Sequence, residues 1–88
     1  MYILVRDVVE KCTENCEGVK LSQICEKANA AESIKVDFFG IIQVTDDFLF
    51  GFLSQLKNTE TSLTQLQYVR TPAYIRRKIQ KVCQVVGQ

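Results

Sequence analysis

The sequence contains no histidine, a single proline and no low-complexity tract in its 88 residues. The lack of histidine bears on metal binding, because structural zinc sites use cysteine with histidine or closely spaced pairs of cysteines. Cys12 and Cys16 are separated by three residues, whereas Cys25 and Cys83 lie far apart in the chain. We therefore expect no metal site, and nothing in the sequence points to a cofactor.

Long apolar runs are also missing. No run approaches the ~18 residues that cross a membrane, and residues 1–7 lack the basic start and apolar core of a signal peptide. These absences predict a soluble, cytosolic protein without membrane contact. A reducing cytosol disfavours disulfides, so we expect free thiols, with Cys25 and Cys83 buried on apolar helix faces.

The length and composition predict one small globular domain over residues 1–88. Hydrophobic residues make up 47% of the chain and charged residues 24%, which is ordinary for a folded domain. A chain of this length buries roughly 60–65% of the surface of its unfolded state. It therefore has room for one modest core.

The stretch 33–56 carries the clearest folding signal. Apolar and polar residues alternate over 34–38, which is typical of a strand with one buried face. After Gly40 the period changes, and one helical stripe is formed by Phe48, Leu49, Phe52, Leu53 and Leu56. The pattern predicts a strand over 33–39, a short bend and a helix over 46–57.

The segment before this stretch predicts a strand and a helix. Residues 2–7 are rich in β-branched and aliphatic side chains and indicate a strand, although helical spacing fits them as well. A helix follows, with Thr13 or Asn15 as the N-cap and an end near 29–31.

The segment after it predicts a loop over 58–62, a third strand over 63–69 and a last helix. Thr71 is placed as the N-cap of that helix and Pro72 at its first position. Its apolar stripe is formed by Ile75, Ile79, Val82, Cys83 and Val86. The order β-α-β-α-β-α predicts the α/β class, with a mainly parallel sheet flanked by helices.

Charge is distributed unevenly along the chain. Residues 1–60 carry six basic and ten acidic side chains, whereas residues 61–88 carry five basic side chains and no acidic one. Four of these basic residues lie on the last predicted helix: Arg76, Arg77, Lys78 and Lys81. They can meet an acidic partner, the acidic half of a second copy in a homodimer, or nucleic acid. Nucleic acid is the weaker reading, because no aromatic residues interleave with them.

The residues IKVDFFGIIQV, TDD and FLFGFLSQL resemble the central segment of STAS-like domains, relatives of the sulfate-transporter and anti-sigma-factor-antagonist fold. The most similar group is a short bacterial STAS-like family whose function is not established. The matching positions are Asp37, Phe38, Gly40, Ile41 and 45–47. The resemblance implies a regulatory protein–protein interaction module and no enzyme. Its partner would be a histidine-kinase-like ATPase or another regulator.

The resemblance also raises the question of a phosphorylation switch. In anti-sigma-factor antagonists, a serine at the start of the helix after this strand is phosphorylated by the partner kinase, which adds negative charge to the binding surface. Asp46 and Asp47 stand there in this chain, and Thr45 is the adjacent hydroxyl. Either Thr45 is phosphorylated, or the fixed charges hold the surface in one state, or the switch is absent.

The candidate partner-binding surface comprises Thr45, Asp46, Asp47, Phe50 and Ser54. Phe50 falls off the apolar stripe, so it is either an exposed contact anchor or covered by a loop. Thr45 followed by two acidic residues is also a plain helix N-cap. Gly51 predicts a close backbone approach to this helix, from the sheet or from a partner.

Acidic residues at this end of the sheet offer an enzymatic alternative. Asp37 lies near the carboxyl end of the predicted central strand and could join Asp46 or Asp47 in a Mg²⁺ or acid–base site. Such a site would need a pocket that contains these carboxylates. The runner-up function is a nucleic-acid-binding regulator that uses the last helix.

Overall fold

The structure is a computed structural model that describes residues 1–27, 33–58 and 66–86. One sheet contains three parallel strands in the order β1 (Tyr2–Leu4), β2 (Ile34–Asp37) and β3 (Leu66–Val69). The helices are α1 (Val5–Val8), α2 (Asn15–Cys25), α3 (Asp46–Asn58) and α4 (Ala73–Val86). The predicted α/β class is confirmed.

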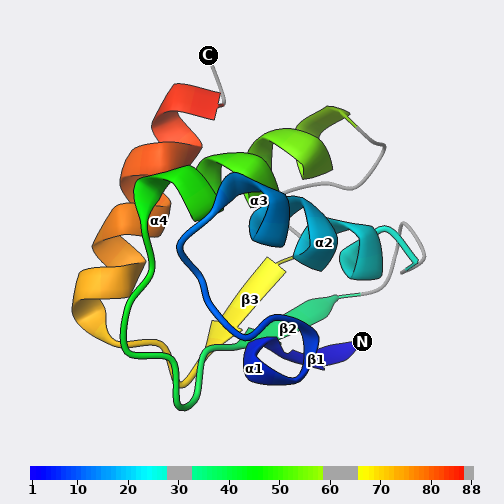
Figure 1. The fold of residues 1–88 in the computed structure, drawn as a ribbon, viewed down its shortest axis with the longest axis vertical. Helices are drawn as coiled ribbons and strands as arrows, with labels where there is room; N and C mark the ends of the chain where they lie inside the picture. Colours follow the sequence, from blue (N-terminus) through cyan, green and yellow to red (C-terminus); the bar gives the residue numbers. More distant parts are fainter. Residues whose placement is uncertain (28–32, 59–65, 87–88) are drawn as a thin grey trace.

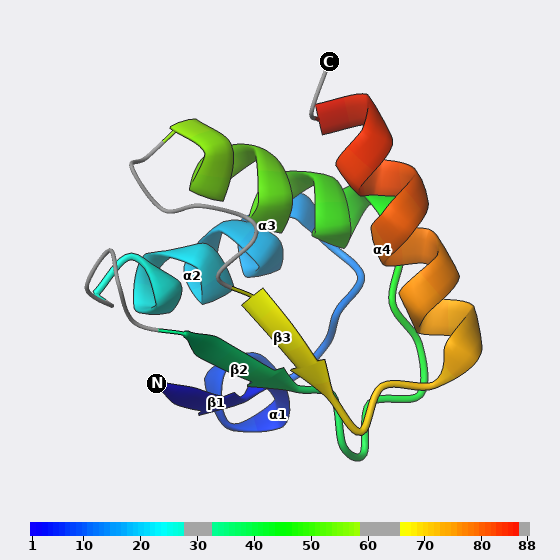
Figure 2. The ribbon, with the colours of Figure 1, turned by 180° about the vertical axis from the view of Figure 1, so that it is seen from behind.

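The three long helices lie on the same side of the sheet (Figures 1 and 2). Both crossovers between strands move one position in the same direction, and right-handed crossovers of this kind place their helices on one face. Ile34 and Val36 therefore face the core with no exposed surface, while Lys35 between them is exposed. The alternation predicted for the central strand is confirmed at Ile34, Lys35 and Val36. It is wrong at Asp37, which is also buried, and the strand ends at Asp37 instead of residue 39.

The first strand is shorter than its sequence suggests. Leu4 pairs with Asp37, the last residue of β2, so a longer β1 would have no partner. The chain instead turns into α1, where the Val9 N–H donates to the Val5 carbonyl at 3.0 Å and Val5 is completely buried. The strand predicted through residue 7 is wrong beyond Leu4.

The N-cap of α2 is Glu14, and the predicted Thr13 or Asn15 is wrong. Glu14 forms a capping box with Glu17, whose carboxylate accepts the Glu14 N–H at 3.4 Å. The helix ends at Cys25. The end predicted near 29–31 is therefore too late, and residues 28–32 lie outside the described part of the chain.

The last helix begins one residue later than predicted. The Pro72 carbonyl accepts the Arg76 N–H at 3.0 Å, which puts Pro72 at the N-cap position. The Thr71 hydroxyl donates to the Val69 carbonyl at 3.1 Å. Of the strand and loop predicted before it, residues 59–65 lie outside the described ranges.

The predicted apolar stripes form the core. All five stripe residues of α3 are without exposed surface, and the α4 stripe is buried except for the half-buried Cys83. The cysteines are free thiols, and burial raises the pKa of Cys12 and Cys25 to about 12. Among the residues described, no helix has the length and apolarity needed to span a membrane.

Helices α2 and α3 touch through their backbones. A Cβ atom at Gly18 would lie 2.0 Å from the Phe48 carbonyl oxygen, and one at Gly51 would lie 2.4 Å from the Asn15 carbonyl oxygen. Only glycine fits at such distances. The close approach predicted at Gly51 is confirmed, but the approaching element is α2 and neither the sheet nor a partner.

Candidate functional site

Thr45 is a structural residue at the start of α3. Its hydroxyl accepts the Phe48 N–H at 3.2 Å and donates to the Thr13 carbonyl at 2.7 Å. Its N–H donates to the Cys12 carbonyl at 3.0 Å, next to the bridge between Cys12 and Val44. Thr45 therefore caps the helix and joins it to the loop before α2, and its hydroxyl both donates and accepts a hydrogen bond.

Asp46 and Asp47 are exposed on the first turn of α3. The Asp46 carboxylate lies 3.4 Å from the Lys81 ammonium of α4. Asp47 accepts a hydrogen bond through its backbone carbonyl from Asn15 at 3.3 Å, and its carboxylate has no partner among the described residues. The two acidic residues thus sit where α2, α3 and α4 come together.

A hollow of about 280 Å³ lies between α3 and α4, and we call it the α3–α4 hollow. Its lining consists of Phe50, Val82 and Val85, with Asp46, Asp47 and Lys81. The side chain of Phe50 is 46% exposed and that of Val85 is 59% exposed. Of the two alternatives left open for Phe50, the structure shows the exposed one. Ser54 donates its hydroxyl to the Phe50 carbonyl within the helix.

The basic residues of α4 are largely engaged within the chain. Arg76 donates to the Thr71 carbonyl at 3.2 Å and to the Tyr68 carbonyl at 2.9 Å. Lys78 donates to the Val44 carbonyl at 2.9 Å, and Lys81 faces Asp46. In the described residues only Arg77 of the predicted basic set has no such partner. These contacts weaken the case for a phosphate-tracking surface on this helix.

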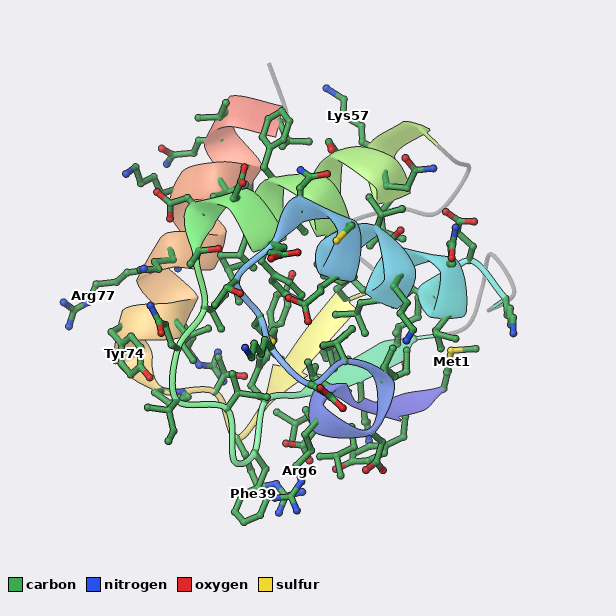
Figure 3. The ribbon with its side chains drawn as sticks, viewed as in Figure 1. Met1, Arg6, Phe39, Lys57, Tyr74 and Arg77 are labelled. Atoms are coloured by element: carbon green, nitrogen blue, oxygen red, sulfur yellow. The ribbon has the colours of Figure 1, made fainter. Side chains whose placement is uncertain are left out.

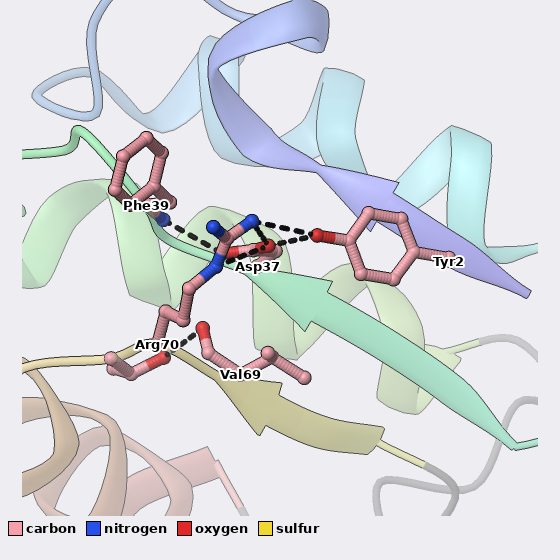
Figure 4. Close-up of polar contacts among 6 residues, drawn as sticks. Tyr2, Asp37, Phe39, Val69 and Arg70 are labelled. Carbon is pink, nitrogen blue, oxygen red and sulfur yellow. Dashed lines mark hydrogen bonds and ion pairs between the residues drawn. The ribbon is translucent and has the colours of Figure 1, made fainter.

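A polar cluster that the sequence did not reveal lies at the carboxyl end of the sheet (Figure 4). Asp37 has no exposed surface, and its carboxylate accepts hydrogen bonds from Arg70, Tyr2 and the Phe39 N–H. The Arg70 Nε lies 3.0 Å from Asp37 Oδ2, and the guanidinium also reaches the Tyr2 hydroxyl at 3.1 Å. Asp37 is covered by these side chains rather than by depth in the protein.

These contacts set the charge of the cluster. Hydrogen bonding from Arg70, helped by the Tyr2 hydroxyl and the Phe39 N–H, lowers the pKa of Asp37 to about 2, against the opposing effect of burial. Because of this low pKa, Asp37 carries a full negative charge at neutral pH.

Arg70 follows β3 with a φ of 48°, in the left-handed region that non-glycine residues seldom adopt.

The enzymatic alternative required Asp37 to share a pocket with Asp46 or Asp47, and the structure does not bring them together. Asp37 pairs with Arg70, whereas Asp46 and Asp47 line the α3–α4 hollow, to which Asp37 does not belong. Within residues 1–27, 33–58 and 66–86, no group of three or more cysteine, aspartate or glutamate side chains could hold a metal ion.

The loop between β2 and α3 exposes apolar side chains beside this cluster. Ile42 is 84% exposed and Phe39 is 50% exposed. Tyr74 of α4 donates its hydroxyl to the Ile42 carbonyl, which holds the loop against the helix. Figure 3 shows Phe39 with Arg6 beside it at this end of the molecule, and Tyr74 on the flank of α4.

Comparisons of the chain with protein-family models, with curated proteins and with solved structures found no match. The STAS-like resemblance therefore stays a prediction from the sequence. The fold, the α3–α4 hollow and the cluster around Asp37 are described from the structure alone.

Proposed function

We propose that the protein is a non-enzymatic regulatory module of the cytosol, resembling STAS-like domains, that binds a partner protein through the loop and helix after the central strand. The observation that carries this proposal is the half-exposed Phe50 ring, which lines an apolar hollow together with Val85. Clustered apolar side chains with a charged rim are characteristic of protein interaction surfaces, and aromatic residues are frequent anchors in them.

The exposed apolar side chains concentrate on this part of the molecule. Of the six large hydrophobic side chains that are exposed in the described ranges, five belong to the loop after β2, to α3 or to α4: Phe39, Ile42, Phe50, Tyr74 and Val85. Phe50 and Val85 line the α3–α4 hollow, whereas Ile42 and Tyr74 meet where the loop contacts α4 and Phe39 lies beside Arg6.

The rim of the hollow indicates the chemistry of the partner. Asp46 and Asp47 place two carboxylates beside the single ammonium of Lys81, which leaves a net negative charge. A partner surface that presents an apolar side chain next to a basic one would complement it. By the STAS-like resemblance this partner is a histidine-kinase-like ATPase or another regulator. A second copy of the chain is the alternative occupant.

The contacts of Thr45 favour a surface without a phosphorylation switch. Its hydroxyl proton is donated to Thr13, and its oxygen caps the helix, so phosphorylation would break both contacts. Asp46 and Asp47 supply permanent negative charge at the same helix start. In this proposal the fixed charges hold the surface in its binding state.

Affinity capture from the source cell, followed by calorimetry with the purified partner, tests the proposal. Phe50→Ala removes the anchor and Asp47→Lys inverts a rim charge, so each should weaken binding about tenfold or more. Gln67→Lys is the control, because it also introduces a lysine, at an exposed position of β3 outside the hollow. Circular dichroism of each variant checks that the fold is intact.

Three other results would contradict the proposal. A protein bound equally by the wild type and both hollow variants would place the contact elsewhere. Nucleic acid captured by the wild type, Phe50→Ala and Asp47→Lys, but lost with Arg77→Ala, would favour binding through the basic helix. No binding of any partner by the wild type, with light scattering showing a monomer, would remove the interaction role.

A further inference from the structure

Two arginines share one aromatic ring at the carboxyl end of the sheet. The guanidinium carbon of Arg70 lies 4.4 Å from the centre of the Phe39 ring, and that of Arg6 lies 5.9 Å from it. Figure 3 shows the Arg6 nitrogens beside Phe39 at the edge of the molecule. This arrangement belongs neither to the α3–α4 hollow nor to the core.

Both guanidinium groups keep unused donors. Within the described residues Arg6 forms no hydrogen bond and no ion pair, and its neighbour Asp7 on α1 forms none either. Arg70 uses Nε and one terminal nitrogen for Asp37 and Tyr2, and its other terminal nitrogen, Nη1, has no acceptor in the described part of the chain. Its side chain is 52% exposed. The free N–H groups are therefore open to water.

The turn beneath Arg6 holds this arrangement. The Ile41 N–H donates to the Phe38 carbonyl at 3.0 Å, and Gly40 has a φ of +80°, which together define a type II turn. A Cβ atom at Gly40 would lie 2.7 Å from Nη1 of Arg6. Glycine thus serves the turn and also lets the guanidinium rest directly on its backbone.

The local charge selects the kind of ligand. Around the Phe39 ring, Arg6 and Arg70 contribute two positive charges and Asp37 one negative charge, so these three side chains carry a single positive charge. The acidic side chains near Arg6, Asp7 and Glu10, line a hollow on its other side together with Glu17 and Lys20. A monoanion balances the single positive charge around the ring. A doubly charged phosphate would leave excess negative charge beside the Asp37 carboxylate, which already takes up the bonded edge of Arg70.

We propose that Arg6, the free Nη1 of Arg70 and the ring of Phe39 form a binding site for a carboxylate. The guanidinium groups donate to the two carboxylate oxygens, and the ring keeps both cations in place. The carboxylate belongs to a small organic acid or to an acidic side chain of a protein. The site lies at the carboxyl ends of β2 and β3, where the chain leaves the sheet at Phe39 and Arg70.

The surroundings leave space for the rest of a ligand. A crevice of about 490 Å³ begins at Gly40 and runs along residues 40–43 on one side and residues 10–13 on the other. Glu10 and Lys11 in its lining carry opposite charges, so the crevice adds no net charge to the site. The site is independent of the α3–α4 hollow, and either can be absent without the other.

Nuclear magnetic resonance titration tests this site directly. Amide and arginine Nε signals of the ¹⁵N-labelled protein would be followed with sodium acetate, sodium benzoate, inorganic phosphate and a capped tetrapeptide with one glutamate. Sodium chloride at equal ionic strength gives the baseline. We expect saturable shifts of the Gly40 amide and the Arg70 Nε with the carboxylates, at lower concentration than with phosphate.

Arg6→Gln and Arg77→Gln form a matched pair of variants. Both remove an exposed arginine without a hydrogen bond in the described residues, but Arg77 lies on α4, far from Arg6 in Figure 3. Loss of one charged donor should weaken carboxylate binding about tenfold in Arg6→Gln and leave Arg77→Gln unchanged. Urea unfolding of both variants checks that stability is retained.

The outcomes separate the source of the carboxylate from the site itself. Tighter binding of the tetrapeptide than of the free acids identifies a protein source, and tighter binding of benzoate identifies a small acid. Both support the proposal. It is overturned if phosphate binds more tightly than every carboxylate, if Arg77→Gln weakens binding as much as Arg6→Gln, or if no probe gives saturable shifts beyond the chloride baseline.

Discussion

The α2–α3 crossing and the carboxyl end of the sheet are stabilised in different ways. At the crossing, Gly18 and Gly51 bring the two helix backbones into direct contact. At the carboxyl end, the side chains of Asp37, Arg70 and Tyr2 hold one another, and Arg70 remains half exposed. The first contact is made between backbone atoms, whereas the second is made by a buried carboxylate whose partner Arg70 reaches water.

This difference separates stability from surface chemistry. The crossing fixes α3, and α3 carries Phe50 and the acidic rim to the surface. The carboxyl end holds the loop on which Phe39 and Ile42 are exposed. We therefore expect substitutions at the crossing to act on folding, and substitutions of the exposed residues to act on binding.

The largest loss of stability is expected for Gly18→Ala. The added methyl group would meet the Phe48 carbonyl oxygen at 2.0 Å and the Phe52 nitrogen at 2.7 Å, both backbone atoms, so α2 and α3 must move apart. We expect a net loss of about 3 kcal/mol in the free energy of unfolding, after the better helix propensity of alanine has offset about 1 kcal/mol of the steric cost. Urea denaturation measures it.

Gln23→Ala serves as the control on the same helix, because Gln23 is exposed. It should change stability by less than about 0.5 kcal/mol. A fully stable Gly18→Ala protein would show that the helices are not in backbone contact.

The next largest effect is expected at the buried carboxylate. Asp37→Asn keeps the size of the side chain but turns an amide group towards the Arg70 guanidinium, and removes the charge that Arg70 and Tyr2 bind. Charge-assisted hydrogen bonds of this kind contribute about 2 kcal/mol, so we expect a loss of that size in urea denaturation. A loss as small as that of a surface substitution would mean that water replaces these contacts without cost.

The same carboxylate predicts how stability depends on pH. Its pKa is about 2 in the folded protein and has the ordinary value of 3.8 in the unfolded chain. A lowered pKa stabilises the folded state above the unfolded pKa, and this contribution disappears as the pH falls from about 4 towards 2. The free energies of unfolding of the wild type and Asp37→Asn, measured by urea denaturation across this pH range, should therefore converge as the pH falls. A constant difference between them would contradict the lowered pKa.

The elements with a strong apolar period were predictable from the sequence. The stripes of α3 and α4 and the alternation in β2 follow from the spacing of apolar residues, and the structure buries them as expected. The first strand was predicted too long, because local propensity does not reveal that β2 offers no partner beyond Asp37.

The pairing of Asp37 with Arg70 could not be read from spacing. The two residues are 33 positions apart, and they meet only because Asp37 lies opposite Val69 in the register and Arg70 adopts a left-handed conformation. The bond from Lys78 to the Val44 carbonyl was likewise hidden, since a basic helix face looks solvated in sequence. Long-range polar contacts depend on three-dimensional placement that periodicity does not encode.

A smaller effect is expected for the cap of α3. Thr45→Val removes the acceptor of the Phe48 N–H and the donor to the Thr13 carbonyl, while keeping the shape of the side chain. Loss of an N-cap costs about 1 kcal/mol, which urea denaturation resolves. Thr45→Ser, which keeps the hydroxyl, is the control and should recover most of the loss. Equal stability of the two variants would deny the capping role.

The smallest effect is expected at the exposed ion pair of Asp46 and Lys81. The side chains are 53% and 71% exposed, and the two charged groups lie 3.4 Å apart. Water and salt screen such a pair, so a double-mutant cycle with Asp46→Asn and Lys81→Gln should give a coupling energy below about 0.5 kcal/mol that shrinks further as salt is added. The buried carboxylate of Asp37 is the contrasting case, because its partners exclude water. A coupling energy at Asp46 as large as the loss in Asp37→Asn would show that exposure does not separate these two ion pairs, and the distinction between a stabilising cluster and a rim available for binding would fail.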